Sequence, residues 1–146
     1  MKINLNLYKK IFVDTAPFIY FYEEHKEFGD ISKEIFTFHK NQKQIFVTSA
    51  LTVMEVLPKP ISENDSDLIK KYINAIKNNP LIDLTEINYD IAFKAAELRA
   101  NYKFLKGIDS LQISNAIESN CDYFITNDER LKNISNIKIL SLTDLI

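Results

Sequence analysis

Short apolar runs alternate with longer amphipathic stretches along the chain. Five of these runs have the composition of buried strands: Ile11–Val13, Ile45–Val47, Leu81–Leu84, Tyr123–Thr126 and Ile137–Leu140. Between the runs, apolar residues recur at helical spacing. Strands that alternate with helices favour a parallel sheet that is covered on both faces. The pattern therefore predicts an α/β fold built on five parallel strands.

The residues that begin and end helices divide the rest of the chain. Pro17 suits the first turn of one helix, and Asp30 is expected to cap the next. A short helix over Ser49–Leu57 should end at Pro58 and Pro60, which cannot continue it. Amphipathic patterns predict three more helices: one within residues 61–79, one from Asn88 to the break at Gly107, and one over Asp109–Asn120.

The composition is that of one soluble globular domain over residues 1–146. The chain is 46% hydrophobic and 26% charged, which is enough apolar material for a core. Its net charge of −2 provides no global positive field of the kind that marks a passive nucleic-acid binder. The same net charge argues less strongly against a nuclease, because the carboxylates of an acidic active site by themselves lower the pI. Glycine is scarce, and there is no phosphate-binding glycine loop.

Cysteine use and hydropathy indicate a cytoplasmic protein. A single cysteine, Cys121, excludes a disulfide within the chain and makes a Cys-based zinc site improbable, so a reducing compartment is the simplest setting. The first residues, MKINLNLYKKIFVDT, lack the apolar region of a signal peptide. The longest uncharged run, Gln44–Met54, is shorter than the roughly 20 apolar residues that span a bilayer. His25 and His39 have polar or amphipathic surroundings and are expected at the surface.

Four acidic residues fall where the predicted strands end. Asp14 directly follows the first strand, and Asp128 follows the fourth. Glu55 lies in the helix that leaves the second strand, and Asp109 opens the helix that precedes the fourth. Ligands of open α/β sheets bind at the carboxyl ends of the strands. We therefore expect these four acids, from four separate elements, to converge on one end of the sheet.

Glu55 interrupts an apolar run, TSALTVMEVLP, whose residues are expected to be buried. A buried ionised carboxylate costs several kcal/mol unless something compensates it. Four clustered carboxylates also cannot all stay ionised without a counter-charge. Mg²⁺ or Mn²⁺ is the natural counter-charge, because these hard cations prefer oxygen ligands. One such ion, or two roughly 4 Å apart, can activate water for phosphodiester hydrolysis and stabilise the leaving oxygen.

Each acid also has a purely structural interpretation. Asp14, Asp109 and Asp128 all stand where a helix cap would be expected. Glu55 fits a capping box that starts at Thr52, although that helix would have barely one turn before Pro58. Only the joint placement of the four acids at strand ends favours a functional site.

Three blocks of the sequence resemble the PIN-domain ribonucleases, above all the VapC-like toxins of type II toxin–antitoxin pairs. The blocks are FVDT, TSALTVMEVL and GIDSLQISNAIESNCDYFITNDERL. The third is the most specific, with an Asp, then Ala116 seven residues later, then an apolar strand and Thr-x-Asp. The segment Ala95–Leu105 is similar to the helix that precedes this block. The likeness runs from Lys10 to the end of the chain, and its length suits a single PIN domain.

The resemblance implies a five-stranded parallel sheet flanked by helices and an acidic Mg²⁺ or Mn²⁺ site that cuts RNA endonucleolytically. The four family acids fall on matching positions: Asp14, Glu55, Asp109 and Asp128. Thr15 matches a small polar residue after the first acid, and Thr126 matches a hydroxyl residue that orients the last. One helix departs from the family pattern, because small residues are usual where this chain has Gln112, Ile113, Ser114 and Asn115.

Roles can be assigned to these residues as expectations. Asp14, Asp109 and Asp128 should hold the metal, directly or through water. Glu55 is either a ligand or the group that orients the attacking water. Arg130 is either an RNA-phosphate contact at the mouth of the site or a solvated helix-end cation.

Partners are expected as well. The aromatic run Phe18–Glu23 cannot be wholly buried on one helix face, so it either leaves a few exposed rings or forms a partner surface. The resemblance implies an RNA substrate, a small antitoxin protein and a homodimer, while the short uncharged runs predict no association with a membrane.

Other classes of protein fit the sequence less well. Haloacid-dehalogenase-like phosphoryl transfer needs a second Asp two residues after the first, where this chain has Ala16. A PIN fold used only for binding, as a catalytically silent scaffold, is the non-enzyme alternative, and the complete set of four acids argues against it. The expected function is that of a metal-dependent endoribonuclease, the toxin of a toxin–antitoxin pair.

Overall fold

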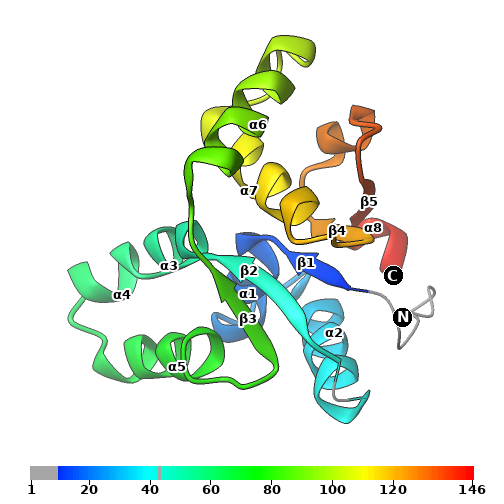
Figure 1. Cartoon of the computed structure of the whole chain (residues 1–146). Coiled ribbons are helices and arrows are strands. Elements are labelled where there is room, and N and C mark those ends of the chain that lie inside the picture. The colour runs from blue at the N-terminus through cyan, green and yellow to red at the C-terminus, as the bar shows by residue number, and fades with distance from the viewer. Residues whose placement is uncertain (1–9, 43) are drawn as a thin grey trace.

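The computed structural model describes residues 10–42 and 44–146 and shows one five-stranded parallel sheet (Figure 1). The strand order is β3-β2-β1-β4-β5, which places β1 at the centre. The strands are Ile11–Val13 (β1), Phe46–Ser49 (β2), Ile82–Thr85 (β3), Tyr123–Thr126 (β4) and Lys138–Ser141 (β5). The predicted α/β class is confirmed, and the bounds of β1 and β4 are those that the apolar runs indicate.

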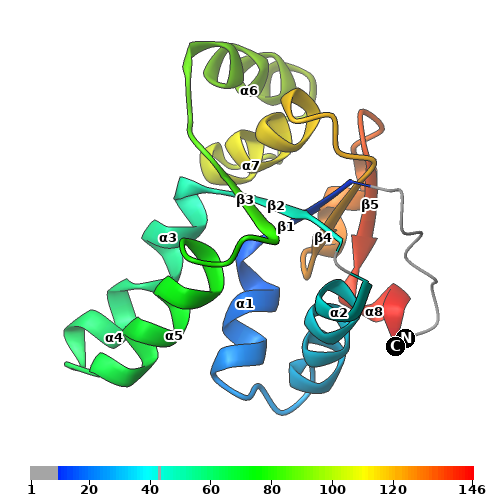
Figure 2. The ribbon, with the colours of Figure 1, turned by 60° about the horizontal axis from the view of Figure 1, so that its bottom comes forward.

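Helices cover both faces of the sheet (Figures 1 and 2). One face carries α6 (Tyr89–Asn101) and α7 (Gly107–Glu118). The other carries α1 (Thr15–Tyr22), α2 (Gly29–Gln42), α3 (Ala50–Val56) and α5 (Ser66–Ile76). Shorter elements complete the chain: α4 (Pro58–Ser62), the 3₁₀ helix η1 (Glu129–Asn133) and α8 (Leu142–Leu145).

The alternation of side chains along β1 divides the core between the two layers. Ile11 and Val13 point into the cluster that packs under α1, α2 and α5, while Phe12 points into the cluster under α6 and α7. All three are fully buried. The ring of Phe12 stacks on Phe124 of β4, with 5.2 Å between the ring centroids. Because both faces of β1 are apolar, the residue after it is the first that can carry a charge.

Several predicted boundaries differ from the structure. Asp30 is not a cap, because α2 already begins at Gly29. Pro58 does not simply end α3: it is the first residue of α4, where a fixed φ and a missing N–H are tolerated. Gly107 begins α7, which makes Asp109 a first-turn residue, whereas Lys106 occupies the cap position. The helix expected from Asn88 to Gly107 is α6, which runs over Tyr89–Asn101; Asn88 caps it and accepts a hydrogen bond from the N–H of Ile91 at 3.0 Å.

The strand register brings the carboxyl ends of β1 and β4 together. Val13 pairs with Ile125, and the N–H of Asp14 extends the ladder with a 2.9 Å bond to the Ile125 carbonyl. Among the described residues, no helix combines the length and apolar character needed to cross a membrane. Residues 1–9, which bear on the signal-peptide prediction, lie outside the described residues.

Candidate active site

Asp14 is the central carboxylate of the predicted site. It caps α1, and its Oδ1 accepts a hydrogen bond from the N–H of Thr15 at 2.8 Å. Its Oδ2 accepts a second bond, from the hydroxyl of Thr126 at 2.9 Å. Burial raises the pKa of Asp14 from 3.8 to about 6. The two hydrogen bonds oppose that rise, and the charges of Glu55 and Asp109 add to it.

Thr126 joins the first acid to the last. Its hydroxyl donates to Asp14 and accepts the backbone N–H of Asp128 at 3.1 Å. From the sequence, Thr126 was expected to orient Asp128. In the structure its hydroxyl donates its proton to Asp14 instead. Because Thr126 is almost fully buried, this link between β1 and β4 is shielded from water.

Asp128 caps η1 and carries its own counter-ion. The Arg130 guanidinium donates a hydrogen bond to each carboxylate oxygen, from Nε to Oδ1 at 3.0 Å and from Nη2 to Oδ2 at 2.6 Å. This bidentate bond lowers the pKa of Asp128 below its usual value. Arg130 is therefore an internal ion-pair partner of the acidic cluster in this structure, and its side chain is exposed.

Glu55 is exposed, so the prediction that its carboxylate is buried in an apolar run is wrong. In α3 the buried positions are Thr52 and Val56, and Glu55 lies at the solvent edge of the face that they form. Its Oε1 accepts a hydrogen bond from the Thr15 hydroxyl at 2.7 Å. Thr15 thus joins the first two acids, giving its N–H to Asp14 and its O–H to Glu55.

Asp109 belongs to the same electrostatic group. Burial raises the pKa of this carboxyl, and the neighbouring charge of Asp128 raises it further. The positive charges of Arg130 and Lys106 act in the opposite direction. The structure thus brings all four predicted acids into mutual interaction: hydrogen bonds link Asp14 to Glu55 and Asp128 through Thr15 and Thr126, and charge couples Asp109 to the set.

The acids fit a hydrated divalent cation better than a closed protein cage. Among residues 10–42 and 44–146, no three His, Cys, Asp or Glu side chains form a ready metal-binding group. Mg²⁺ does not require one, because it keeps several waters and is held by one or two carboxylates. The four side chains offer only oxygen donors, and the pKa of Asp14 is raised first by burial and then by the charges of Glu55 and Asp109. The donor set therefore suits Mg²⁺ or Mn²⁺.

A buried polar layer beneath the acids was not anticipated from the sequence. The side chains of Thr48, Ser49, Thr52 and Gln112 are each at most 1% exposed and bond to one another. Asn115 extends the layer to β3, where the Thr85 hydroxyl donates to its Oδ1 at 2.7 Å. The sequence feature that could have revealed this layer is the set of polar residues on the inward face of α7, where an apolar stripe would be usual.

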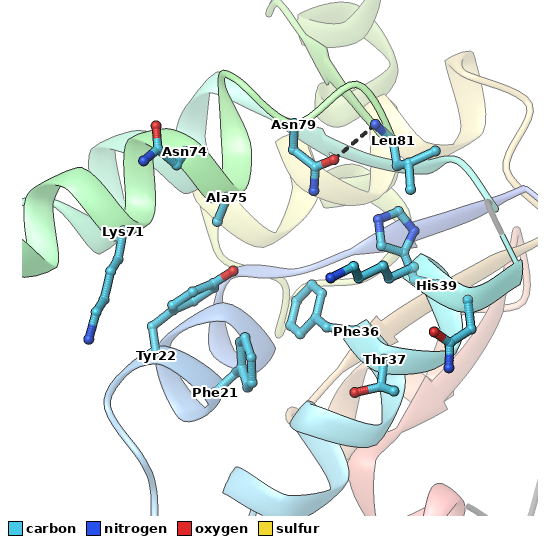
Figure 3. A pocket seen from close by; sticks show the side chains of 12 residues that line it. Phe21, Tyr22, Phe36, Thr37, His39, Lys71, Asn74, Ala75, Asn79 and Leu81 are labelled. Carbon is cyan, nitrogen blue, oxygen red and sulfur yellow. Dashed lines mark hydrogen bonds between the residues drawn. The ribbon is translucent and has the colours of Figure 1, made fainter.

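A second concave surface lies at the opposite end of the sheet from the acids, where β3 begins. This groove, of about 740 Å³, has an aromatic floor formed by Phe21 and Tyr22 of α1 and Phe36 of α2 (Figure 3). Lys71 of α5 and Lys40 of α2 lie among its lining residues. His39 is buried here, contrary to the surface expectation: its ring stacks on Phe46, and burial lowers its pKa to about 4.

Comparisons place this architecture among known proteins. The family model of the PIN domain matches residues 11–137. Among solved structures, similar ones include VapBC2 from Rickettsia felis bound to a DNA fragment from its promoter (TM-score 0.70, 16% identity, 90% of this chain and 98% of that one). A toxin–antitoxin complex from Klebsiella pneumoniae has a TM-score of 0.69 at 19% identity, covering 90% and 97%.

A third similar structure is VapC20 from Mycobacterium tuberculosis, described as a sarcin–ricin loop cleaving toxin. Its TM-score is 0.69 at 11% identity, over 88% of this chain and 98% of that one. A comparison with curated protein sequences finds no match.

The buried carboxyl of Asp14 should make the protein less stable as the pH rises. Its pKa is about 6 in the folded state and near 3.8 when unfolded, so the folded state binds more protons between these values. The stabilisation by the protonated form, at most about 3 kcal/mol, is complete below pH 3.8 and is lost as the pH rises through 6. In urea unfolding, the stability of Asp14→Asn minus that of wild type should therefore increase from about pH 4 to about pH 7.

Asp67→Asn is the matched control, because Asp67 is an exposed acid in the first turn of α5. The pH dependence of its difference from wild type should be small beside that of Asp14→Asn. If Asp14→Asn behaves in the same way as this control, the carboxyl of Asp14 is not destabilised by its surroundings.

Proposed function

This chain belongs to the PIN-domain family, and from that premise we propose that it is a metal-dependent endoribonuclease, the toxin of a toxin–antitoxin pair. The observation that carries the proposal is the electrostatic coupling of four carboxylates: Asp14 interacts with Glu55 and Asp109, and Asp109 interacts with Asp128. A binding-only protein gains nothing from such a group, because unrelieved repulsion costs stability. A cation recruited to the site relieves the repulsion and provides chemistry.

Each acid then has a distinct task. Asp14, Asp109 and Asp128 would hold Mg²⁺ or Mn²⁺, which when bound lowers the pKa of a water ligand and polarises the scissile phosphate. Thr15 and Thr126 fix the orientation of both oxygens of Asp14. Glu55 is solvent-accessible and anchored by one oxygen to Thr15, which leaves the other to orient the attacking water.

Cations at the mouth of the site provide contacts for the RNA backbone. Arg130 is exposed, and its guanidinium can bind a phosphate in the same bidentate manner in which it binds Asp128. Lys106 lies close enough to influence both Asp109 and Asp128. These two cations would draw a polyanion toward an otherwise repulsive acidic cluster.

A small antitoxin is the proposed protein partner, by analogy with the toxin–antitoxin complex from Klebsiella pneumoniae. The groove between α1, α2 and α5 offers it an aromatic floor (Figure 3). Its described lining residues include Lys40 and Lys71 and no acid. An amphipathic segment with apolar side chains and flanking carboxylates complements this surface.

A second copy of the chain is the proposed partner for another surface, on α3, α4 and α5. Met54, Ile61 and Ile73 are each more than a third exposed there. Next to them is a small apolar hollow lined in part by Val53, Leu57 and Leu84. Apolar side chains that gather on one exposed surface are a common feature of protein interfaces. A homodimer formed on this surface would bury them.

Cleavage of total RNA by the purified chain tests the enzymatic proposal. With Mg²⁺ or Mn²⁺, we expect discrete cuts that EDTA abolishes, and a loss of at least about a hundredfold in rate for Asp14→Asn, which keeps the shape and removes the charge. Asp67→Asn should cleave like wild type. Absence of cuts by the folded, antitoxin-free wild-type protein would favour a PIN fold used only for binding.

The charge of the groove can be tested in an antitoxin-binding assay. The probe is the product of a short reading frame adjacent to this gene, and a gene without such a neighbour would contradict the antitoxin proposal. Lys71→Glu should weaken its binding about tenfold at low ionic strength and less at high salt, because the rim charge is screened. Lys70→Glu is the matched control, since Lys70 is exposed on the same helix and does not line the groove. Equal effects of the two substitutions would exclude this groove as the charged contact.

A further inference from the structure

Gln112 bridges two of the helices that carry acids. It lies on α7 one turn after Asp109, and its side chain is 1% exposed. Its Oε1 accepts a hydrogen bond from the hydroxyl of Ser49, the residue that caps α3. Its Nε2 donates to the hydroxyl of Thr52 at 3.0 Å, and Thr52 lies one turn before Glu55. A single amide thus joins the helix of Asp109 to the helix of Glu55.

The bridge continues to the strand that carries Asp14. The hydroxyls of Thr52 and Thr48 are 2.8 Å apart, and the Thr48 hydroxyl donates to the carbonyl of Val13 at 2.9 Å. Since Thr48 gives its only proton to Val13, Thr52 must donate to Thr48 and accept from Gln112. Val13 directly precedes Asp14, so one directed chain of hydrogen bonds connects α7, α3 and β1.

Only one orientation of the Gln112 amide is consistent with this series of hydrogen bonds. If the amide were reversed, Thr52 would have to donate to Gln112, and Thr48 could not satisfy both of its neighbours. Ser49, Thr48 and Thr52 are fully buried, so water cannot replace a missing partner. A hydrogen-bonded chain of this kind holds its members at fixed separations.

We propose that Gln112 is a positioning residue that sets the separation of Asp109 from Glu55 and Asp14, and with it the affinity of the site for a divalent cation. This proposal rests on the proposed function, since it concerns the same acids. Gln112 touches none of the four carboxylates in a hydrogen bond, and it acts through the elements that carry them.

A substitution of Ser114 serves as the control that distinguishes a loss of metal-site geometry from a general loss of protein stability. It lies on the same helix, is fully buried, and its hydroxyl donates to the carbonyl of Ile91 at 2.6 Å. That bond ties α7 to α6, which carries none of the four acids. Loss of the Ser114 hydroxyl therefore removes a buried hydrogen bond from α7 without loosening its contact with α3 or β1.

The test measures Mn²⁺ binding by isothermal titration calorimetry, at a temperature where circular dichroism shows each variant to be folded. Gln112→Met fills a similar volume and removes both hydrogen bonds. We expect it to raise the Kd for Mn²⁺ at least tenfold, the usual effect of removing a group that orients metal-binding residues. Ser114→Ala should stay within about twofold of wild type even though it also loses a buried hydrogen bond.

A second variant removes the hydrogen-bond partner of Gln112 on α3. Thr52→Val keeps nearly the same shape, removes the hydroxyl that accepts from Gln112, and should raise the Kd in the same direction. Wild-type affinity in either Gln112→Met or Thr52→Val, or an equal shift in Ser114→Ala, overturns the positioning role. If wild type itself binds no Mn²⁺ and cuts no RNA, the proposed function fails instead, so the two failures are distinguishable.

Discussion

Repulsion between carboxylates at the carboxyl ends of the strands is the constraint on which the site depends. The register of β1 against β4 fixes Asp14 beside the segment that leads to Asp128, and α3 and α7 bring Glu55 and Asp109 to the same place. The fold offsets this repulsion in part. Two threonines donate protons to Asp14 and Glu55, and Arg130 neutralises Asp128. Burial is the main cause of the raised pKa of Asp14, and the charges of Glu55 and Asp109 add to it. We propose that a bound cation offsets this remaining negative charge.

The polar layer under the acids explains how a flexible set of side chains can keep a defined geometry. The four acids come from elements that are distant in sequence, so apolar packing alone would leave their relative depth adjustable by small sliding motions. Hydrogen bonds have direction, and buried ones cannot be exchanged for water. The bonds of Gln112 to Ser49 and Thr52 therefore determine the position of α7 relative to α3. Small residues at the same positions of α7 could not form these bonds, and apolar packing alone would set the contact.

Much of this organisation could be predicted from local patterns. The apolar runs located β1 and β4, the start of α6 was placed within one residue, at Asn88, and the acids were placed at strand ends. Two kinds of feature were not accessible. The exposure of Glu55 depends on the exact phase of α3, in which Thr52 and Val56 face inward. The partners of Gln112 are 60 and 63 residues away, and no local pattern encodes such a contact. Pro58 was ambiguous because proline fits both the end of one helix and the start of another.

The most direct measurement of the central claim is anomalous diffraction from crystals of the wild-type chain grown with Mn²⁺. We expect a Mn²⁺ peak at the carboxyl edge of β1 and β4, bound directly or through one water by at least two of Asp14, Asp109 and Asp128, with the Arg130 guanidinium displaced from its partner. No peak at this edge under saturating Mn²⁺, or a peak only at acids elsewhere on the surface, would contradict the claim that the four carboxylates form a cation site.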